Sequence, residues 1–207
     1  MNSSLRIEPR ENILLLHLES PDDFPRLTRA VLAQLLQAVE NAQPDASVSA
    51  AVISGTEKCF AAGADLEEVS ALAPLEARRF AELGQSLMRR IETSRKPVVA
   101  AIRGHCLGGG FDLALACHLR VAAGDARLGH PGGSLGIFTG WGGTQRLPRL
   151  IGRSHAEELL FTGRLISARE AQAWKLVNRV VPPEETLAVA LHLAQQAAST
   201  GAAANVD

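Results

Sequence analysis

Residues 132–136 of the chain read GGSLG and fit the G-x-S-x-G pattern, in which a serine hydroxyl is the nucleophile of a hydrolase. That chemistry needs a strand before Ser134 and a helix directly after it, because the sharp turn between them exposes the hydroxyl. Pro131, Gly132 and Gly133 precede the serine, and the glycines of the following LGIFTGWGG segment do not sustain a helix. We therefore do not expect Ser134 to be a nucleophile.

A better candidate for ligand binding is a run of three glycines within residues 97–123, PVVAAIRGHCLGGGFDLALACHLRVAA. An apolar strand leads into Gly108, Gly109 and Gly110, and an apolar helix follows. The start of that helix would present unpaired backbone N–H groups and a positive dipole end, which stabilise a ligand carbonyl that gains negative charge. The same glycines would also serve if they only allowed the strand and the helix to pack tightly. The residues alone leave both interpretations open.

Two side chains near these glycines could transfer protons. Asp112 lies just inside the predicted helix, in an otherwise apolar run with Phe111 and Leu113. Its carboxylate is either a first-turn charge that the helix dipole favours or a general base in a partly dry pocket. His130 precedes Pro131 in a loop, where a lone histidine is usually solvated, and it is the weaker acid–base candidate.

Small residues dominate a second possible ligand-binding segment, EKCFAAGADLEEV at residues 57–69. Its residues 61–64 would let a ligand lie directly against the backbone. Asp65 is placed to cap a helix that begins at Leu66. Taken by itself, the segment is equally well an ordinary turn and helix cap.

His105, Cys106, Cys117 and His118 are possible metal ligands by residue type. The two pairs lie at opposite ends of the predicted glycine turn and helix, without the C-x-x-C or H-x-x-x-H spacing that places ligands on one face. We interpret them as buried thiols and as capping or surface histidines, and we expect no metal site.

Length and charge limit the classes of function. A chain of 207 residues can form one domain with a substantial core. Its 21 Lys and Arg residues nearly balance 22 Asp and Glu residues, and no long basic or acidic run occurs. This balance argues against nucleic acid or an anionic membrane as the main partner.

Cysteine usage and the first residues bear on the location of the protein. Three scattered cysteines are too few for a disulfide framework in a chain of this size, which favours a reducing compartment. The first apolar run covers only residues 13–16 and has charged flanks, so we expect neither a signal peptide nor a membrane span there. We expect a cytoplasmic protein.

The elements that would hold these residues alternate between strand and helix. Short runs rich in Val, Ile and Leu predict buried strands at residues 13–18, 50–53, 98–102 and 177–181. Apolar residues at helical spacing predict helices across residues 27–39 and 80–91. This alternation is typical of an α/β fold with parallel strands. The small, polar residues at positions 195–207 are expected to be frayed.

Four segments together resemble the enoyl-CoA hydratase/isomerase family, also called the crotonase superfamily. They are FAAGADLEEV at residues 60–69, IRGHCLGGGFDLALACHLRVAA at 102–123, GWGGTQRLPRLIG at 140–152 and FTGRLISAREAQAWKLVNRVV at 161–181. Any one of them is suggestive, and their shared order makes the resemblance strong. It extends over residues 13–194, nearly the whole chain.

The resemblance implies a fold, an assembly and a substrate class. The fold would be a spiral of ββα units with peripheral C-terminal helices, assembled as a homotrimer or a dimer of trimers. The substrate would be an acyl-CoA thioester, so coenzyme A is part of the substrate and no separate cofactor is expected. By motif position, the backbone N–H groups of Ala64 and Gly109 would form an oxyanion hole for the thioester. Contacts to substrate or CoA are implied at Arg26, Leu27, Ala62, Asp65, Gly108 and Gly132.

The sequence departs from the family pattern at the acids. Hydratases of the family use two glutamates to hold and activate water. The first falls at Asp112, the second falls at Gly132, where no acid exists, and Gly140 stands where some relatives carry an aspartate. One carboxylate cannot act as base and acid at separate points in the usual hydration geometry. His130, next to the missing acid, would supply a second proton carrier if its loop turns inward.

Family members usually continue with further helices that cover the acyl tunnel, whereas this chain stops soon after a predicted helix at residues 187–194. We expect a single domain over residues 1–207, with a C-terminal helical part from about residue 150 that is shortened relative to the family. The acyl pocket would be more open, or closed by a partner subunit.

These residues predict one of two functions. The first is an acyl-CoA-processing enzyme, a lyase or an isomerase, in which Ala64 and Gly109 polarise the thioester and Asp112 handles the proton. The second is an acyl-CoA-binding protein that has lost its chemistry together with the second glutamate, an interpretation that Gly132 favours.

Overall fold

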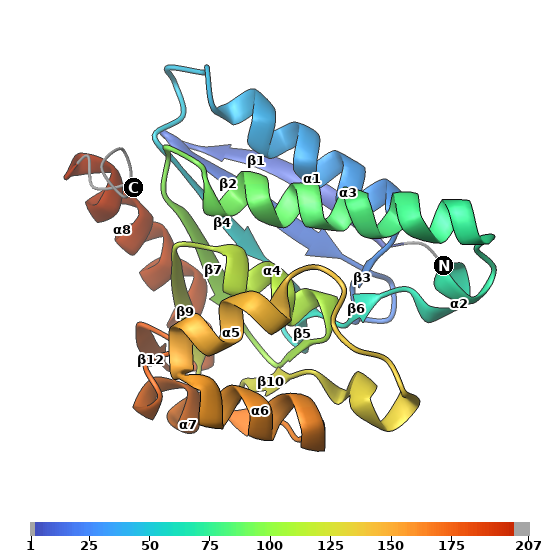
Figure 1. The fold of residues 1–207 in the computed structure, drawn as a ribbon. Coiled ribbons are helices and arrows are strands. Elements are labelled where there is room, and N and C mark those ends of the chain that lie inside the picture. Colours follow the sequence, from blue (N-terminus) through green and yellow to red (C-terminus); the bar gives the residue numbers. More distant parts are fainter. Residues whose placement is uncertain (1–2, 201–207) are drawn as a thin grey trace.

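The computed structural model describes residues 3–200, with the exception of the side chains of Ser134 and Leu135. A six-stranded sheet in the order β1-β2-β4-β7-β9-β12 forms the centre of the molecule (Figure 1). Within this sheet β1 and β2 pair antiparallel, and the other neighbours are parallel. The strands are β1 (Ser4–Arg10), β2 (Ile13–Glu19), β4 (Ala50–Ser54), β7 (Val98–Ile102), β9 (Leu119–Ala123) and β12 (Arg179–Val181).

The alternation of side chains along these strands creates two apolar layers. Leu16 and Ile53 belong to one layer, whereas Leu15 and Val52, their neighbours in the chain, belong to the other. Helices α1 (Arg29–Ala42) and α3 (Pro74–Glu92) cover the first face, and α8 (Thr186–Ser199) covers the second (Figure 1). Strands β4 and β7 are buried on both faces, which explains why they appear in the sequence as continuous apolar runs.

A second, smaller sheet provides the second strand of each ββα unit. It has the order β11-β10-β8-β5 and consists of β5 (Cys59–Ala61), β8 (His105–Leu107), β10 (Arg127–Gly129) and β11 (Ile166–Ser167). Strands β4, β7 and β9 of the large sheet are each followed in the chain by β5, β8 and β10 of this one. With the helices that come after them, these pairs form the spiral of ββα units that the family resemblance implies.

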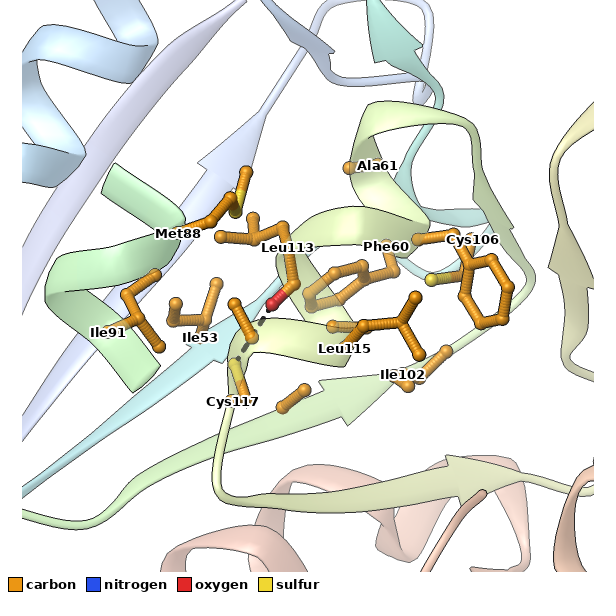
Figure 2. Packing of buried hydrophobic residues seen from close by; sticks show 14 of the residues in the cluster. Ile53, Phe60, Ala61, Met88, Ile91, Ile102, Cys106, Leu113, Leu115 and Cys117 are labelled. Carbon is orange, nitrogen blue, oxygen red and sulfur yellow. Dashed lines mark hydrogen bonds between the residues drawn. The ribbon is translucent and has the colours of Figure 1, made fainter. Parts of the chain in front are cut away.

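Helix α4 (Gly109–Ala116) runs through the interior of the molecule. Residues 110–116 are all buried, and Figure 2 shows Leu113 and Leu115 of this helix among other core residues such as Met88 and Ile102. An eight-residue helix whose side chains are apolar apart from Asp112 is stable only in such a position. Its first turn is therefore held firmly against the neighbouring strands.

The side chain of Arg120 secures the other end of α4. This buried guanidinium donates hydrogen bonds to the carbonyl oxygens of Leu176 at 2.7 Å, Ala114 at 3.2 Å and Cys117. Carbonyl groups at the end of a helix lack the partners of a regular turn, so the arginine adds hydrogen bonds where an unpaired buried carbonyl would be costly. It also joins α4 to the segment that precedes β12.

The remaining elements are short, and half of them lie in the C-terminal third. They are β3 (Arg26–Leu27), β6 (Gly63–Ala64), α2 (Leu66–Ser70), the 3₁₀ helix η1 (Pro131–Leu135), α5 (Gly143–Ile151), α6 (Arg153–Thr162), α7 (Ala168–Ala173) and the 3₁₀ helix η2 (Pro183–Glu185). No helix among residues 3–200 combines the length and apolar character needed to cross a membrane.

Most elements expected from the sequence are present. The strands expected at residues 13–18, 50–53 and 98–102 agree with the structure within one residue, whereas the fourth is shorter and begins at Arg179. The expectation of a frayed segment from residue 195 is wrong for residues 195–199, which continue α8 because Ala190 and Ala194 anchor it on the sheet. The same expectation for residues 201–207 stays a prediction, because these residues lie outside the described part of the chain.

One packing contact accounts for a glycine in the middle of a long helix. Gly84 lies within the 19 residues of α3, where glycine costs about 1 kcal/mol relative to alanine. A Cβ atom at Gly84 would lie 2.3 Å from the indole nitrogen of Trp141. Phe80, one turn earlier, contacts the same ring, with ring centroids 5.5 Å apart. The helix thus makes room for the tryptophan at a cost to its own helical propensity.

We expect Gly84→Ala to lower the free energy of unfolding by about 1–3 kcal/mol, because the new methyl group overpacks the indole ring. In a Trp141→Ala background the same substitution should instead stabilise the fold by up to about 1 kcal/mol through helical propensity. Urea unfolding of the wild type, the two single variants and the double variant measures both effects. Stabilisation by Gly84→Ala in the wild-type background would contradict this account.

Candidate active site

Two backbone segments far apart in the sequence meet at the start of α4. The pairing of β3 with β6 places Leu27 beside Ala64, and β6 lies against the glycine turn before α4. Gly63 has φ +99°, and a Cβ atom there would lie 3.0 Å from the backbone nitrogen of Gly109. Gly108 has φ +52°, in the left-handed region that favours glycine. The contact therefore depends on glycine on both sides.

The N–H groups at this contact are suited to bind an oxygen that carries negative charge. Gly109 is the first residue of α4, so its N–H has no carbonyl partner within the helix and lies at the positive end of the helix dipole. Ala64, which directly follows Gly63, borders the same cavity as Gly109. This arrangement has the form of a two-donor oxyanion site.

The contact borders a cavity of about 170 Å³ that brings together most of the predicted site residues. Ala62, Ala64, Gly108, Gly109, Asp112, His130 and Gly132 all line it. Leu66, Ile137, Phe138 and Trp141 form its apolar walls. Among the described residues that line it, Asp112 is the one acid, as the sequence predicted.

Asp112 is a buried carboxyl group with one oxygen engaged and one free. The hydroxyl of Thr139 donates a hydrogen bond to Oδ2, whereas Oδ1 has no hydrogen-bond partner among the described residues. The group is 1% exposed, and burial raises its pKa to about 6. The Thr139 hydroxyl, the nearby backbone N–H groups of Trp141 and Gly143, and the Arg146 charge all oppose that rise. Asp112 is thus ionised at neutral pH and yet able to hold a proton in a catalytic cycle.

His130 faces this free oxygen, so the expectation of a solvated loop histidine is wrong. Its side chain is 6% exposed, its ring contacts Phe111, and its Nε2 lies 3.4 Å from Asp112 Oδ1. Burial lowers the pKa of His130 to about 4, so the imidazole is neutral at neutral pH. The loop that carries it does turn inward, which is the condition under which the sequence predicted a second proton carrier.

Gly143 allows the two side chains to approach each other. A Cβ atom at this position would lie 2.3 Å from Asp112 Oδ1 and 2.8 Å from His130 Nε2. The first residue of α5 therefore leaves open the space between the carboxylate and the imidazole. We refer to Asp112 and His130 below as the Asp–His pair.

Gly132 lines the cavity, but a side chain there would meet the backbone. A Cβ atom would lie 2.8 Å from the carbonyl oxygen of Ile137, whose N–H in turn donates to the carbonyl of Gly132 at 2.9 Å. The local backbone is therefore closed around a glycine. The conformation of this loop, and not only the residue type, therefore disfavours an acidic side chain at position 132.

Three of the residues implied as CoA contacts lie outside the cavity lining. The side chain of Leu27 is fully buried in the core, so only its backbone could face a ligand. Arg26 is paired with Asp22 at 2.9 Å on the surface beside β6. Asp65 caps α2, as predicted, and accepts hydrogen bonds from the backbone of Glu67 and Glu68.

Two residues of the site were missed by the sequence analysis, Thr139 and Trp141. Both belong to the glycine-rich segment LGIFTGWGG, whose last four residues form part of a family segment but whose side chains at positions 139 and 141 received no role. A hydroxyl and a large aromatic group between glycines are the signals that could have drawn attention to them. Their partners, Asp112 and Gly84, lie far away in the sequence.

The structure gives no support to a serine nucleophile at position 134 or to a metal site at the cysteine and histidine pairs. Ser134 lies within η1 rather than between a strand and an α-helix, which is the context that a nucleophile elbow needs. Burial raises the pKa of Cys117 to about 12 and that of Cys106 well above its ordinary value, so both thiols are inert. His118 accepts a hydrogen bond from the backbone N–H of Val98 through Nδ1. No group of three potential metal ligands occurs among the described residues.

A larger cavity of about 530 Å³ lies elsewhere, where β2, β4 and β7 end. Its lining includes the hydrogen-bonded pair His17 and Ser54, together with Arg103, Glu19 and Asp23. None of the residues at the glycine contact or in the Asp–His pair lines it. Its mixture of charges does not point to one class of ligand, and we assign the chemistry to the smaller cavity.

Comparison with known proteins identifies the family of this chain. The family model described as enoyl-CoA hydratase/isomerase matches residues 8–206. A crotonyl-CoA hydratase of Syntrophomonas wolfei is 42% identical over 196 residues, which cover 94% of this chain and 75% of the relative. A 2,3-dehydroadipyl-CoA hydratase of Escherichia coli is 41% identical over 199 residues, with 95% and 76% covered. The crystal structure of an enoyl-CoA hydratase from Bacillus anthracis superposes with a TM-score of 0.89 at 38% identity, covering 96% of this chain and 77% of that one. By sequence and by fold, the chain belongs to the enoyl-CoA hydratase/isomerase family of acyl-CoA-processing enzymes.

Proposed function

We propose that this protein shifts the double bond of an enoyl-CoA thioester, using Asp112 as the single base. The observation that carries the proposal is the Asp–His pair: one ionised, buried carboxylate with a free oxygen, next to a neutral imidazole and without a second acid among the described residues of the cavity. A shift of a double bond needs one group that takes a proton and returns it elsewhere. Hydration in the usual manner of the family needs two acids.

The reaction begins with the thioester oxygen at the N–H groups of Ala64 and Gly109. Asp112 takes a proton from the α-carbon of a 3-enoyl thioester, and the electrons of the broken C–H bond delocalise onto the thioester oxygen. The two N–H groups and the positive end of α4 stabilise the resulting dienolate. Asp112 then returns the proton to the γ-carbon, and a 2-enoyl thioester forms. No cofactor takes part in this sequence of steps.

His130 acts on Asp112 in this scheme. Its neutral Nε2, in the N–H tautomer, faces Oδ1 at 3.4 Å and can donate to that oxygen once the substrate has bound. The same contact would favour the carboxylate over the carboxylic acid.

Hydration is the second candidate, and the printed names of the relatives favour it, because several are hydratases. In that reaction a water molecule would lie between Asp112 and His130, one of which would take its proton while the other passed a proton to the α-carbon. An acyl-CoA-binding protein without turnover is the third outcome.

A panel of CoA thioesters distinguishes these functions. The wild type would be incubated with 3-enoyl-, 2-enoyl- and malonyl-type thioesters in deuterated water, and the products followed by chromatography and mass spectrometry. We expect 3-enoyl substrate to become 2-enoyl product without the mass of water and with little deuterium, because Asp112 returns the proton that it took. A dominant gain of water from 2-enoyl substrate would overturn isomerisation in favour of hydration. Binding without turnover of any thioester would favour the binding protein.

The oligomeric state and the cellular location of the protein are also proposals. We expect a homotrimer or a dimer of trimers from the family resemblance alone, and a role in the fatty acid metabolism of the cytoplasm from the substrate class and the cysteine usage. Light scattering of the purified protein measures the first of these.

Asp112→Asn should lower kcat by about 10²- to 10⁴-fold, because an amide cannot take the proton. Binding of a saturated acyl-CoA should change little, since the amide still fills the site and can accept from Thr139. The matched control is Asp125→Asn, which alters an exposed acid outside the cavity. Equal turnover in Asp112→Asn and the control would remove the proposed role of Asp112.

The pH dependence of kcat/KM should show loss of activity below about pH 6, because the reactive form of Asp112 is the carboxylate. The Thr139 hydroxyl lowers the pKa of Asp112, so Thr139→Val should move the acid limb to higher pH. Thr139→Ser, which keeps the hydroxyl, should leave the limb in place. A limb that does not move in a folded Thr139→Val variant would show that this hydrogen bond does not tune the base.

Gly132→Glu should fail to create a hydratase, although it restores the type of acid that hydratases use at this position. The new Cβ atom would force the loop away from Ile137 and disturb the neighbouring Asp–His pair. We expect the existing turnover to fall to a similar extent in Gly132→Glu and in Gly132→Ala, the steric control. A tenfold or larger gain of hydration with glutamate alone would contradict this expectation.

A further inference from the structure

Trp141 forms a wall of the cavity directly beside the predicted oxyanion site. It lines the cavity with Gly109 and is 5% exposed. A Cβ atom at Gly109 would lie 2.2 Å from Cζ3 of the indole ring. The ring therefore packs against the backbone of the residue whose N–H would hold the thioester oxygen.

The position of this wall is fixed from several sides. On its far side the indole meets Gly84 of α3, where a Cβ atom would lie 2.3 Å away. The carbonyl of Trp141 accepts a hydrogen bond from Arg146 at 2.9 Å, and the carbonyl of Gly140 accepts one from Gln85 at 2.9 Å. Held between two helices and tied at the backbone, the ring cannot turn aside for a ligand.

The cavity that this wall leaves is small. Its volume is about 170 Å³, below the roughly 300–1,000 Å³ of ordinary ligand pockets. An apolar cavity of about 150 Å³ holds a molecule the size of benzene, with about six carbon atoms. A thioester whose oxygen is fixed at Gly109 must fit its acyl group into this remaining space or direct it outward.

We infer that Trp141 is a specificity-determining residue, which restricts the substrate to thioesters with short or compact acyl groups. The inference rests on the proposed binding of acyl-CoA in this cavity, but it does not depend on the reaction that follows. A long acyl chain that does not fit the cavity could instead lie outside it, along the exposed side chains of Ile137 and Phe138 at the cavity edge. In that case long and short acyl groups would bind with similar affinity, whereas confinement by Trp141 would weaken the binding of long ones.

The test measures dissociation constants for saturated butyryl-, hexanoyl-, octanoyl- and decanoyl-CoA by calorimetry. We expect the wild type to bind decanoyl-CoA about tenfold or more weakly than butyryl-CoA, and Trp141→Ala to shift that ratio by about tenfold or more toward the long chain. Trp141→Leu keeps apolar packing and should shift the ratio in the same direction if Trp141→Ala does not fold. Trp174→Phe is the matched control, because Trp174 stacks on His155 and does not line the cavity.

The outcomes separate this inference from the proposed reaction. Equal affinity of the wild type for short and long chains, or an unchanged ratio in a folded Trp141 variant, would overturn the role of Trp141 even if isomerisation is observed. Selective binding that depends on Trp141 would support it even if no isomerisation occurs. Failure to bind any acyl-CoA would overturn both.

Discussion

The close contact between β6 and the turn before α4 is the constraint on which the rest of the site depends. Two stretches of backbone approach each other more closely than any side chain at Gly63 would allow. The glycine conformation at Gly108 then directs the chain into α4. Because residues 110–116 of α4 are buried and Arg120 secures the far end of the helix, the first turn cannot shift to relieve the contact. The N–H of Gly109 is thus held in place by the fold itself, which is the property that an electrostatic donor to a ligand would need.

The same burial gives the Asp–His pair its chemical character. A carboxylate at the surface would be a weak base at neutral pH, whereas desolvation brings the pKa of Asp112 close to the range in which a group both takes and returns a proton. The hydroxyl of Thr139 prevents the shift from going so far that the acid stays protonated. The pKa of Asp112 is thus a balance between loss of water, which raises it, and the hydrogen bonds and the Arg146 charge that lower it. The neighbouring imidazole of His130 is neutral at neutral pH, because burial lowers its pKa.

The fold was predictable from the sequence to the extent that local patterns determine it. Strands β4 and β7 form continuous apolar runs, and the glycine turn with Asp112 lies within a single short segment, so sequence reasoning located them. The inward position of His130 and the roles of Thr139 and Trp141 depend on how the loop after β10 folds back over α4. That path is set by packing between residues that are distant in the sequence, such as Gly84 and Trp141. Local composition identified the loop as glycine-rich but could not show which residues it would bring together.

The fit of Trp141 between Gly84 and Gly109 has a consequence for how this site can evolve. Losing the tryptophan would free Gly84 to become alanine, a change that helical propensity favours by about 1 kcal/mol. Once that methyl group is present, a returning indole ring would find its place occupied. Trp141 can therefore be lost by a single substitution, but once Gly84 has become alanine it cannot be regained without a second change. A chain that keeps the aromatic residue must also keep both glycines, so a change at any one of the three positions constrains the other two.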